Sequence, residues 1–227
     1  MKKLVFLTGA GISAESGIST FRDSDGLWER HRIEDVASIE GWHRNPELVN
    51  DFYNKRRTQL SECEPNAAHQ IIAELENLFD VTVITQNVDN LHEKAGSSRV
   101  IHLHGELTKA CSENQKGYVT DIGFREIVFG EKAPDGHLLR PFIVWFGEEV
   151  PLMEFAMTEV ESADYLVIIG TSLNVYPAAG LYHYAKPGIP IWLIDPNETQ
   201  PVNKHVKIIR EKATKGMDIL KKELIND

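Results

Sequence analysis

The stretch that most constrains this chain is its beginning, where an apolar run at residues 4–7 leads into a glycine-rich turn. The turn is made of Gly9, Ala10, Gly11, Ile12, Ser13 and Ala14. This spacing, Gly-x-Gly-x-x-Ala, is typical of a buried parallel strand that turns into a helix whose N-terminus faces a phosphate. Gly9 would permit the turn, Gly11 would let a pyrophosphate approach the backbone, and Ala14 would let helix and strand pack closely. The alternative is an ordinary strand–turn–helix corner, in which small residues serve packing alone.

The composition is that of a globular chain with one large domain, or one domain with an insertion. It has 227 residues, of which 42% are hydrophobic and 26% charged. The formal net charge of −10 argues against nucleic acids and anionic membranes as partners. The first apolar segment is too short for a signal peptide, and no run approaches the ~20 apolar residues of a membrane span. Cys63 and Cys111 are far apart and are expected to be free thiols, so we expect a cytoplasmic protein. No amphipathic extension requires a dimer, so we also expect a monomer.

Strand and helix patterns alternate at both ends of the chain and dissolve in the middle. Strands are predicted at 3–7, 81–85, 99–103, 165–169 and 191–194, and helices at 45–61, 66–78, 152–162, 177–185 and 214–224. Residues 109–140 contain few apolar side chains and should form a surface insertion with little core. This order predicts an α/β fold with a Rossmann-like, doubly wound, mostly parallel sheet of six or seven strands.

Two parts are expected, with the active site in the cleft between them. The large domain would contain residues 1–25, 66–108 and 141–227, and a small inserted module would contain residues 26–65 and 109–140. Ligands of such sheets sit at the carboxyl ends of the strands. Polar or glycine-rich stretches follow four predicted strands there: Gly9–Ala14, Gln86–Asp89, Gly170–Ser172 and Asp195–Asn197. Any one of them could be a solvated loop, but all four should share one edge of the sheet.

The best candidate for a general base is His104, because an unperturbed histidine titrates near pH ~6.5. It follows an extended segment and precedes Gly105, so its side chain could project from a strand end. His102 would share its face, which leaves a two-histidine metal site as the rival interpretation. Asn87 and Asp89 lie just past a buried strand. They could bind a hydroxyl or water and an amide donor, or only close the strand in an Asx turn.

The predicted helix 45–61 carries an arginine on an apolar stripe. Val49, Tyr53, Arg56 and Leu60 fall at i, i+4, i+7 and i+11. A buried unpaired charge is costly, so Arg56 must reach solvent or meet an anion. With Tyr53 one turn earlier, Arg56 could grip a carboxylate through both oxygens. An internal salt bridge to an acid of the sheet is the alternative.

Taken together, five motifs resemble the signature set of the sirtuins, a family of NAD-dependent protein-lysine deacylases. They occur in family order over nearly the whole chain: Gly9–Ser13, Phe21-Arg22, Gln86–Asp89, His104-Gly105 and Gly170–Ser172. Ala37, Tyr53 and Arg56 further resemble the class III branch. In that branch a tyrosine and an arginine read the distal carboxylate of succinyl-, malonyl- or glutaryl-lysine, and a small alanine widens the acyl pocket.

The resemblance implies NAD as co-substrate and acylated lysine side chains of proteins as substrates. His104 would activate the ribose hydroxyls, Asn87 would order ribose and water, and Asp89 with Val88 would bind the nicotinamide amide. Further cofactor contacts are implied for Gly9, Ala10, Gly11, Ile12, Ala14, Phe21, Arg22, Trp28, Gln86, Gly170, Thr171, Ser172, Asp195, Asn197 and Ala213. The substrate backbone would add as a strand between two segments, made of Val144, Trp145, Phe146 and Gly147, and of Asn174, Val175 and Tyr176.

One departure from the family concerns zinc. Most sirtuins carry two Cys-x-x-Cys pairs that bind structural zinc, whereas this chain has only Cys111 in that region. One soft ligand cannot make a tetrahedral site, so no zinc is expected. The segment 109–140 must then be held by packing or stay mobile.

The expected function is an NAD-dependent protein-lysine deacylase that removes succinyl, malonyl and also acetyl groups, giving nicotinamide and O-acyl-ADP-ribose. The alternatives are a plain deacetylase, an NAD glycohydrolase or ADP-ribosyltransferase, and a non-catalytic module that binds NAD or ADP-ribose. An intact set of His104, Asn87 and Asp89 argues against the last of these.

Overall fold

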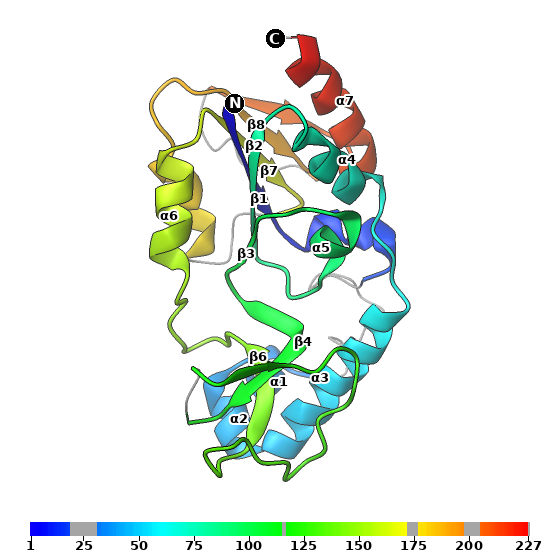
Figure 1. The fold of residues 1–227 in the computed structure, drawn as a ribbon, viewed down its shortest axis with the longest axis vertical. Helices are drawn as coiled ribbons and strands as arrows, with labels where there is room; N and C mark the ends of the chain where they lie inside the picture. The colour runs from blue at the N-terminus through cyan, green and yellow to red at the C-terminus, as the bar shows by residue number, and fades with distance from the viewer. Residues whose placement is uncertain (19–30, 115–116, 172–176, 198–204, 227) are drawn as a thin grey trace.

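The computed structural model describes residues 1–18, 31–114, 117–171, 177–197 and 205–226. Two parts can be followed in Figure 1, each built around its own sheet. The larger sheet has the strand order β3-β2-β1-β7-β8-β9, and every neighbouring pair is parallel. Its strands are β1 (Lys3–Thr8), β2 (Asp80–Thr85), β3 (Val100–His102), β7 (Tyr165–Ile169), β8 (Ile191–Ile194) and β9 (Val206–Ile209). The predicted parallel α/β sheet is confirmed.

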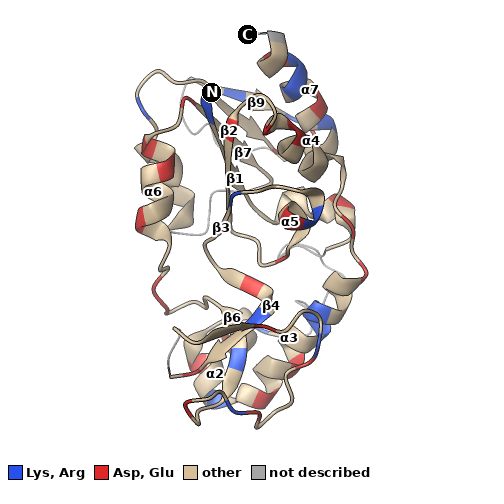
Figure 2. Ribbon diagram, in the orientation of Figure 1, with Lys and Arg blue, Asp and Glu red and all other residues tan. Residues whose placement is uncertain are grey.

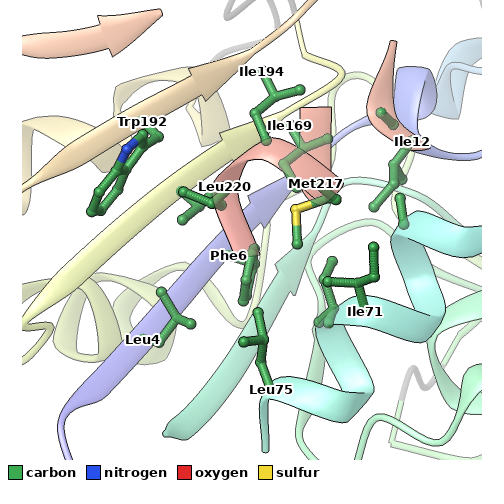
Figure 3. Close-up of a cluster of buried hydrophobic side chains, with 14 of the residues drawn as sticks. Leu4, Phe6, Ile12, Ile71, Leu75, Ile169, Trp192, Ile194, Met217 and Leu220 are labelled. Atoms are coloured by element: carbon green, nitrogen blue, oxygen red, sulfur yellow. The ribbon is translucent and has the colours of Figure 1, made fainter. Parts of the chain in front are cut away.

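Both faces of this sheet are covered, which is why its central strands read as continuous apolar runs. Helices α4 (Ala67–Leu75) and α7 (Ala213–Asn226) pack on one face, and α6 (Met153–Glu161) and the 3₁₀ helix η3 (Ala178–Tyr184) on the other. Figure 3 shows the first of these layers. There, side chains of β1 and β7 meet Ile71 and Leu75 of α4 and Met217 and Leu220 of α7.

Charge is distributed unevenly over these layers. Helix α6 carries Glu154, Glu159 and Glu161 and no basic residue (Figure 2). Lys3 of the central strand β1 forms an ion pair with Glu159 at 2.9 Å. Helix α6 is therefore acidic, and one of its glutamates pairs with the sheet. No helix in the described part of the chain combines the length and the apolar character needed to cross a membrane.

The smaller part combines three helices with a three-stranded antiparallel sheet. The helices are α1 (Ile33–Val36), α2 (Ile39–Arg44) and α3 (Pro46–Ser61), and the sheet has the order β5-β4-β6. Its strands are β4 (Gly105–Ser112), β5 (Val119–Asp121) and β6 (Leu139–Ile143). Helix α3 begins as expected, since the Asn45 side chain accepts a hydrogen bond from the Leu48 amide and Pro46 occupies the first turn.

The segment 109–140 is more structured than its sequence suggested. It contributes to all three strands of the small sheet and has a core of its own, made of Ala110, Ile122, Ile127, Ala133 and Leu139. These apolar residues are widely spaced along the chain, and antiparallel pairing brings them together. No local window shows that pattern, so the expectation of little core was wrong.

Residues 9–18, the described stretch after β1, also differ from expectation, because they form no α-helix. Two 3₁₀ turns, η1 (Ala10–Ile12) and η2 (Ala14–Ser16), end at Gly17, which is left-handed with φ 88°. The Asn66 side chain donates to the Ile12 carbonyl at 2.8 Å, so a residue 54 positions away takes the acceptor that a helix would use. Residues 177–185 likewise fold as the 3₁₀ helix η3 instead of the predicted α-helix.

Candidate active site

Four loops meet at the carboxyl edge of the parallel sheet, as expected from their positions after β1, β2, β7 and β8. The Gly9 amide donates to the Ile169 carbonyl at 3.0 Å, and the Gln86 amide donates to the Thr8 carbonyl at 2.9 Å. The Gly170 amide bonds the carbonyl of Ile194 at 3.0 Å. These backbone bonds hold the ends of four neighbouring strands in one row, so polar groups far apart in sequence face the same space.

The glycines at this edge allow two loops to touch. A Cβ built on Gly11 would lie 2.6 Å from the Gly170 Cα, and one on Gly9 would lie 2.8 Å from the Gly170 carbonyl oxygen. Gly170 itself has φ +61°, a conformation that suits glycine. Close backbone packing therefore explains both glycines of the motif directly. Ala14 is exposed, so the expected packing of its side chain against the strand is not present.

A buried hydroxyl links the first loop to the second. Ser13 is 0% exposed; its Oγ donates to Asp89 Oδ2 at 3.0 Å and accepts from Asn87 Nδ2 at 3.1 Å. The Leu91 amide donates to the other Asp89 oxygen at 3.2 Å. Burial raises the pKa of Asp89, and these two hydrogen bonds oppose that rise. Ser13 was not among the expected site residues, although it lies within the first motif.

His104 has the hydrogen bonding of a base held in one tautomer. Its Nδ1 lies 3.0 Å from the Gln86 carbonyl oxygen, which can only accept, so Nδ1 carries the hydrogen. The lone pair is then on Nε2. Burial lowers the pKa of His104, partly offset by the bond to Gln86, and the ring is neutral at pH 7. A neutral imidazole with a free Nε2 can take a proton.

His102 is not placed as a second metal ligand beside His104. Its Nδ1 lies 3.1 Å from the Asn87 carbonyl oxygen, and its Nε2 lies 2.7 Å from Glu93 Oε1 on α5 (Leu91–Ala95). Among the described residues, no group of three His, Cys, Asp or Glu side chains could hold a metal ion. The two-histidine metal site is therefore not supported.

On α3, the predicted stripe is buried except at its arginine. Val49, Tyr53 and Leu60 are each 2% exposed or less, whereas Arg56 is half-buried. The guanidinium carbon of Arg56 lies 5.9 Å from the centre of the Tyr53 ring. Burial lowers the pKa of Arg56, while the negative charge of Asp89 raises it. Arg56 is therefore near enough to the 86–89 loop for the charge of Asp89 to act on it.

Trp145 forms one side of this region. Its indole nitrogen donates to the Tyr53 hydroxyl oxygen at 3.0 Å. The Arg140 guanidinium carbon lies 3.6 Å from the centre of the Trp145 ring, and Arg140 also makes two hydrogen bonds to Glu148 at 3.0 and 3.1 Å. A buried ion pair therefore fixes the tryptophan against α3.

The segment around Trp145 connects the base to the small module. The Val144 amide donates to the His104 carbonyl at 2.9 Å, and the Phe146 amide donates to the Ala37 carbonyl at 2.9 Å. Ala37 is 5% exposed, whereas Phe146 and Gly147 are exposed. The expected substrate-binding stretch 144–147 thus runs along the site from His104 toward Ala37.

The remaining expected cofactor residues occupy two places. Gln86 Nε2 donates to Thr171 Oγ1 at 3.3 Å, which joins the loops after β2 and β7. Asp195 and Asn197 bond each other after β8, and the buried Ala213 begins α7 beside the second 3₁₀ turn. Seven expected residues lie outside the described part of the chain: Phe21, Arg22, Trp28, Ser172, Asn174, Val175 and Tyr176.

Comparison with known proteins gives the family. Residues 9–177 match the model of the Sir2 family. The chain is 56% identical to an NAD-dependent protein deacylase of Bacteroides thetaiotaomicron, over 99% of each chain. It is 53% identical to an NAD-dependent protein deacylase of Helicobacter pylori, over 99% of this chain and 98% of that one. A solved Sir2 homolog–NAD complex matches with a TM-score of 0.89 and 43% identity, covering 99% of this chain and 90% of that one. The chain therefore belongs to the Sir2 family.

Proposed function

We propose that this chain is a protein deacylase that removes acidic acyl groups, succinyl or malonyl, from lysine side chains and also removes acetyl. The coarser activity, NAD-dependent protein deacylation, follows from identity above half over nearly the full length of curated relatives with that name. The acyl preference rests on one observation: a buried tyrosine hydroxyl and a half-buried arginine lie one helical turn apart beside the site.

The chemistry of this pair supports an anionic ligand. Tyr53 Oη already accepts a hydrogen bond from Trp145, which leaves the hydroxyl hydrogen for another acceptor. Arg56 supplies a positive charge and parallel N–H donors. A terminal carboxylate on the acyl chain could accept from both, while an acetyl group offers neither charge nor oxygen there. Loss of such a charged pair typically costs ~2–5 kcal/mol.

The donor set at the sheet edge fits NAD as co-substrate. A neutral imidazole, a carboxamide and a carboxylate converge there, suited to ribose hydroxyls and to the amide of nicotinamide. When bound, NAD supplies the ribose carbon that accepts the acyl oxygen as nicotinamide leaves. His104 Nε2 takes a proton from a ribose hydroxyl, because Nδ1 is committed to the Gln86 carbonyl. Ser13 holds Asn87 and Asp89 at hydrogen-bond distance, so both side chains are oriented before ligands arrive.

We further propose that the fold needs no zinc, because direct hydrogen bonds hold the small sheet and its loop on α3. Asn54 makes two bonds to the backbone of Ile127, both at 3.0 Å. The fully buried Arg57 donates from Nε to the Leu107 carbonyl at 2.6 Å and from Nη1 to Asn54 Oδ1 at 2.7 Å. These contacts tie α3 both to β4 and to the loop before β6. The sequence does not single out Arg57, because the apolar stripe of this helix includes Arg56 and not Arg57.

The test of this function is nicotinamide release with and without acylated peptides. A deacylase releases nicotinamide only when an acyl-lysine peptide is present, and the acidic-acyl assignment requires faster release with succinyl than with acetyl peptide. Release without peptide would indicate an NAD glycohydrolase. No release with any peptide, together with measurable NAD binding, would indicate a non-catalytic module.

A further inference from the structure

His102, the last residue of β3, has no part in the function proposed above. The residue is 8% exposed, and its side chain lies between the loop after β2 and helix α5. Nδ1 is 3.1 Å from the carbonyl oxygen of Asn87, and Nε2 is 2.7 Å from Oε1 of Glu93. One imidazole ring therefore bridges a helix and the loop that carries two candidate site residues.

Both partners of the ring accept hydrogen bonds. A backbone carbonyl has no hydrogen to give, and an ionised carboxylate accepts only. A neutral imidazole has a single N–H, so only the protonated ring satisfies both contacts. Burial opposes the charge, but the hydrogen bond and the negative charge of Glu93 outweigh it and raise the pKa of His102. The same bond lowers the pKa of Glu93 against the effect of burial.

We propose that protonated His102 is a positioning residue, which holds the 86–89 loop in its active geometry by tying the Asn87 carbonyl to the Glu93 carboxylate. The inference rests on the proposed function, since Asn87 and Asp89 are assigned there to ribose, water and nicotinamide. His102 touches no reacting atom and acts through its contact with the Asn87 carbonyl.

Asn87 is held from three directions, and His102 supplies one of them. The Asn87 amide donates to Thr85 Oγ1 at 3.0 Å, and its side-chain nitrogen donates to the Gly9 carbonyl at 3.2 Å and to Ser13. These bonds come from β2 and from the first loop. Among the described residues, His102 bonds the Asn87 carbonyl, and the Leu107 amide donates to the next carbonyl of the loop, that of Val88, at 2.8 Å. Misplacing a catalytic group by ~1 Å can cost about 100-fold in rate.

Other titratable groups face His102 from each neighbouring element. Glu106 on β4 also favours the charged ring, although its own ion pair is with Lys109 at 2.7 Å. The positive charge of Lys109 lowers the pKa of Glu93. The charge of His102 lowers the pKa of Asp89, and the charge of Glu93 raises it. On α5 and α4, His92 and His69 are buried, which lowers the pKa of His92 and brings that of His69 to about 4. These two rings therefore stay neutral above pH 6.

The experiment is the pH profile of kcat/KM for NAD, from pH 6 to 9.5, at saturating succinyl peptide. In the wild type the profile rises as His104 loses its proton and falls as His102 loses its proton. Glu93→Gln removes the charge that supports the imidazolium, so the falling limb should move to lower pH while the rising limb stays. His102→Asn should lower kcat/KM by about 10- to 100-fold at pH 6.5, and the falling limb should be lost.

Glu106→Gln is the matched control, because Glu106 favours the charged ring through its charge alone, whereas Glu93 is also hydrogen-bonded to the ring. Its falling limb should move much less than that of Glu93→Gln. Equal shifts in the two variants, or wild-type kcat/KM in His102→Asn, would overturn the inference.

A second readout needs no variant and no activity. In ¹⁵N-labelled wild-type protein, the His102 ring should be more than half protonated on both nitrogens at pH 6.5, and a mainly neutral ring would overturn the inference. A wild type that fails to deacylate any peptide would reject the proposed function instead, and the ring titration would still be measurable.

Discussion

The indole nitrogen of Trp145 donates a hydrogen bond to the Tyr53 hydroxyl oxygen at 3.0 Å, and both side chains are at most 3% exposed. The bond turns the tyrosine into a donor, since its oxygen is already used as an acceptor. Burial raises the pKa of Tyr53, so the hydroxyl keeps its hydrogen at any pH of interest. A fixed neutral donor next to Arg56 is the feature from which the acyl preference is argued.

The role of His104 gives the first prediction. His104→Ala removes the only group assigned to take the ribose proton, so turnover should fall to background while NAD affinity changes by less than about threefold. Nicotinamide release and calorimetric titration with NAD measure the two quantities. The exposed His43→Ala serves as a control and should behave like the wild type. Substantial turnover in His104→Ala would reject its role as the base.

Close loop packing gives a second prediction. Gly11→Ala would place a Cβ 2.6 Å from the Gly170 Cα, a backbone atom that cannot rotate away. We expect a loss of about 1–3 kcal/mol in the free energy of unfolding, as for other overpacked sites. Gly117→Ala meets nothing within 4 Å and is the control. Equal unfolding midpoints in urea for the two variants would show that the loops do not need this contact.

An element of this fold could be predicted from the sequence where a local pattern of apolar residues marks it, and could not where it depends on pairing with a distant segment. Strands 165–169 and 191–194 were predicted to the residue, because both faces are buried and the run is continuously apolar. Strand β9 was missed because it lies at the sheet edge with two exposed residues. Strands β4 and β5 depend on pairing across a loop, which no local pattern reveals.

In the candidate site, the residues could be predicted from the sequence, but their arrangement could not. His104, Asn87 and Asp89 could be selected from residue type and from their position after predicted strands. Their arrangement could not, because the buried hydroxyl that joins Asn87 to Asp89 belongs to Ser13, more than seventy positions away. The glycine motif was found, yet the packing of Gly11 on Gly170 emerges only when β1 and β7 are adjacent.

The buried His69 gives a prediction about acid stability. Its pKa is about 4 in the folded chain, because burial opposes its charge, against about 6.5 when unfolded. Between these values the unfolded chain binds more protons, so the free energy of unfolding falls as the pH is lowered from 6.5 to 4. The loss from this group is at most ~3 kcal/mol.

His69→Gln should reduce this pH dependence. Glutamine does not titrate, and it can still accept the Asn66 amide bond that His69 makes at the start of α4. Urea unfolding at pH 7 and pH 4.5 measures the difference for both proteins. A residual slope is expected from His92, whose pKa burial also lowers. An unchanged slope in His69→Gln would show that His69 does not titrate upon unfolding.

The metal content of the purified protein is a separate test. Asn54 and Arg57 are proposed to hold the small sheet in place of a metal, so the purified protein should contain no stoichiometric zinc. A chelator should leave the thermal midpoint unchanged. Asn54→Ala should instead lower that midpoint, because two backbone groups of Ile127 lose their partners. Stoichiometric zinc, or unfolding by the chelator, would contradict the proposal.

Lys55→Met is the matched control for Arg56→Met, the variant that tests the acyl assignment. It removes the same charge one position earlier on α3, where the exposed lysine pairs with Asp51. This variant should keep both desuccinylation and deacetylation. A loss of desuccinylation seen only in the position 56 variant would then be due to Arg56 itself and not to the net charge of the helix.

The most direct measurement is kcat/KM for matched succinyl and acetyl peptides on the wild type and on Arg56→Met. Methionine keeps the length of the apolar stem and removes the charge. We expect desuccinylation to fall by roughly 30-fold or more, as ~2–5 kcal/mol of lost charge pairing implies, while deacetylation stays within about threefold of the wild type. Equal losses on the two substrates would mean that Arg56 is structural, and the acidic-acyl assignment would then give way to a plain deacetylase.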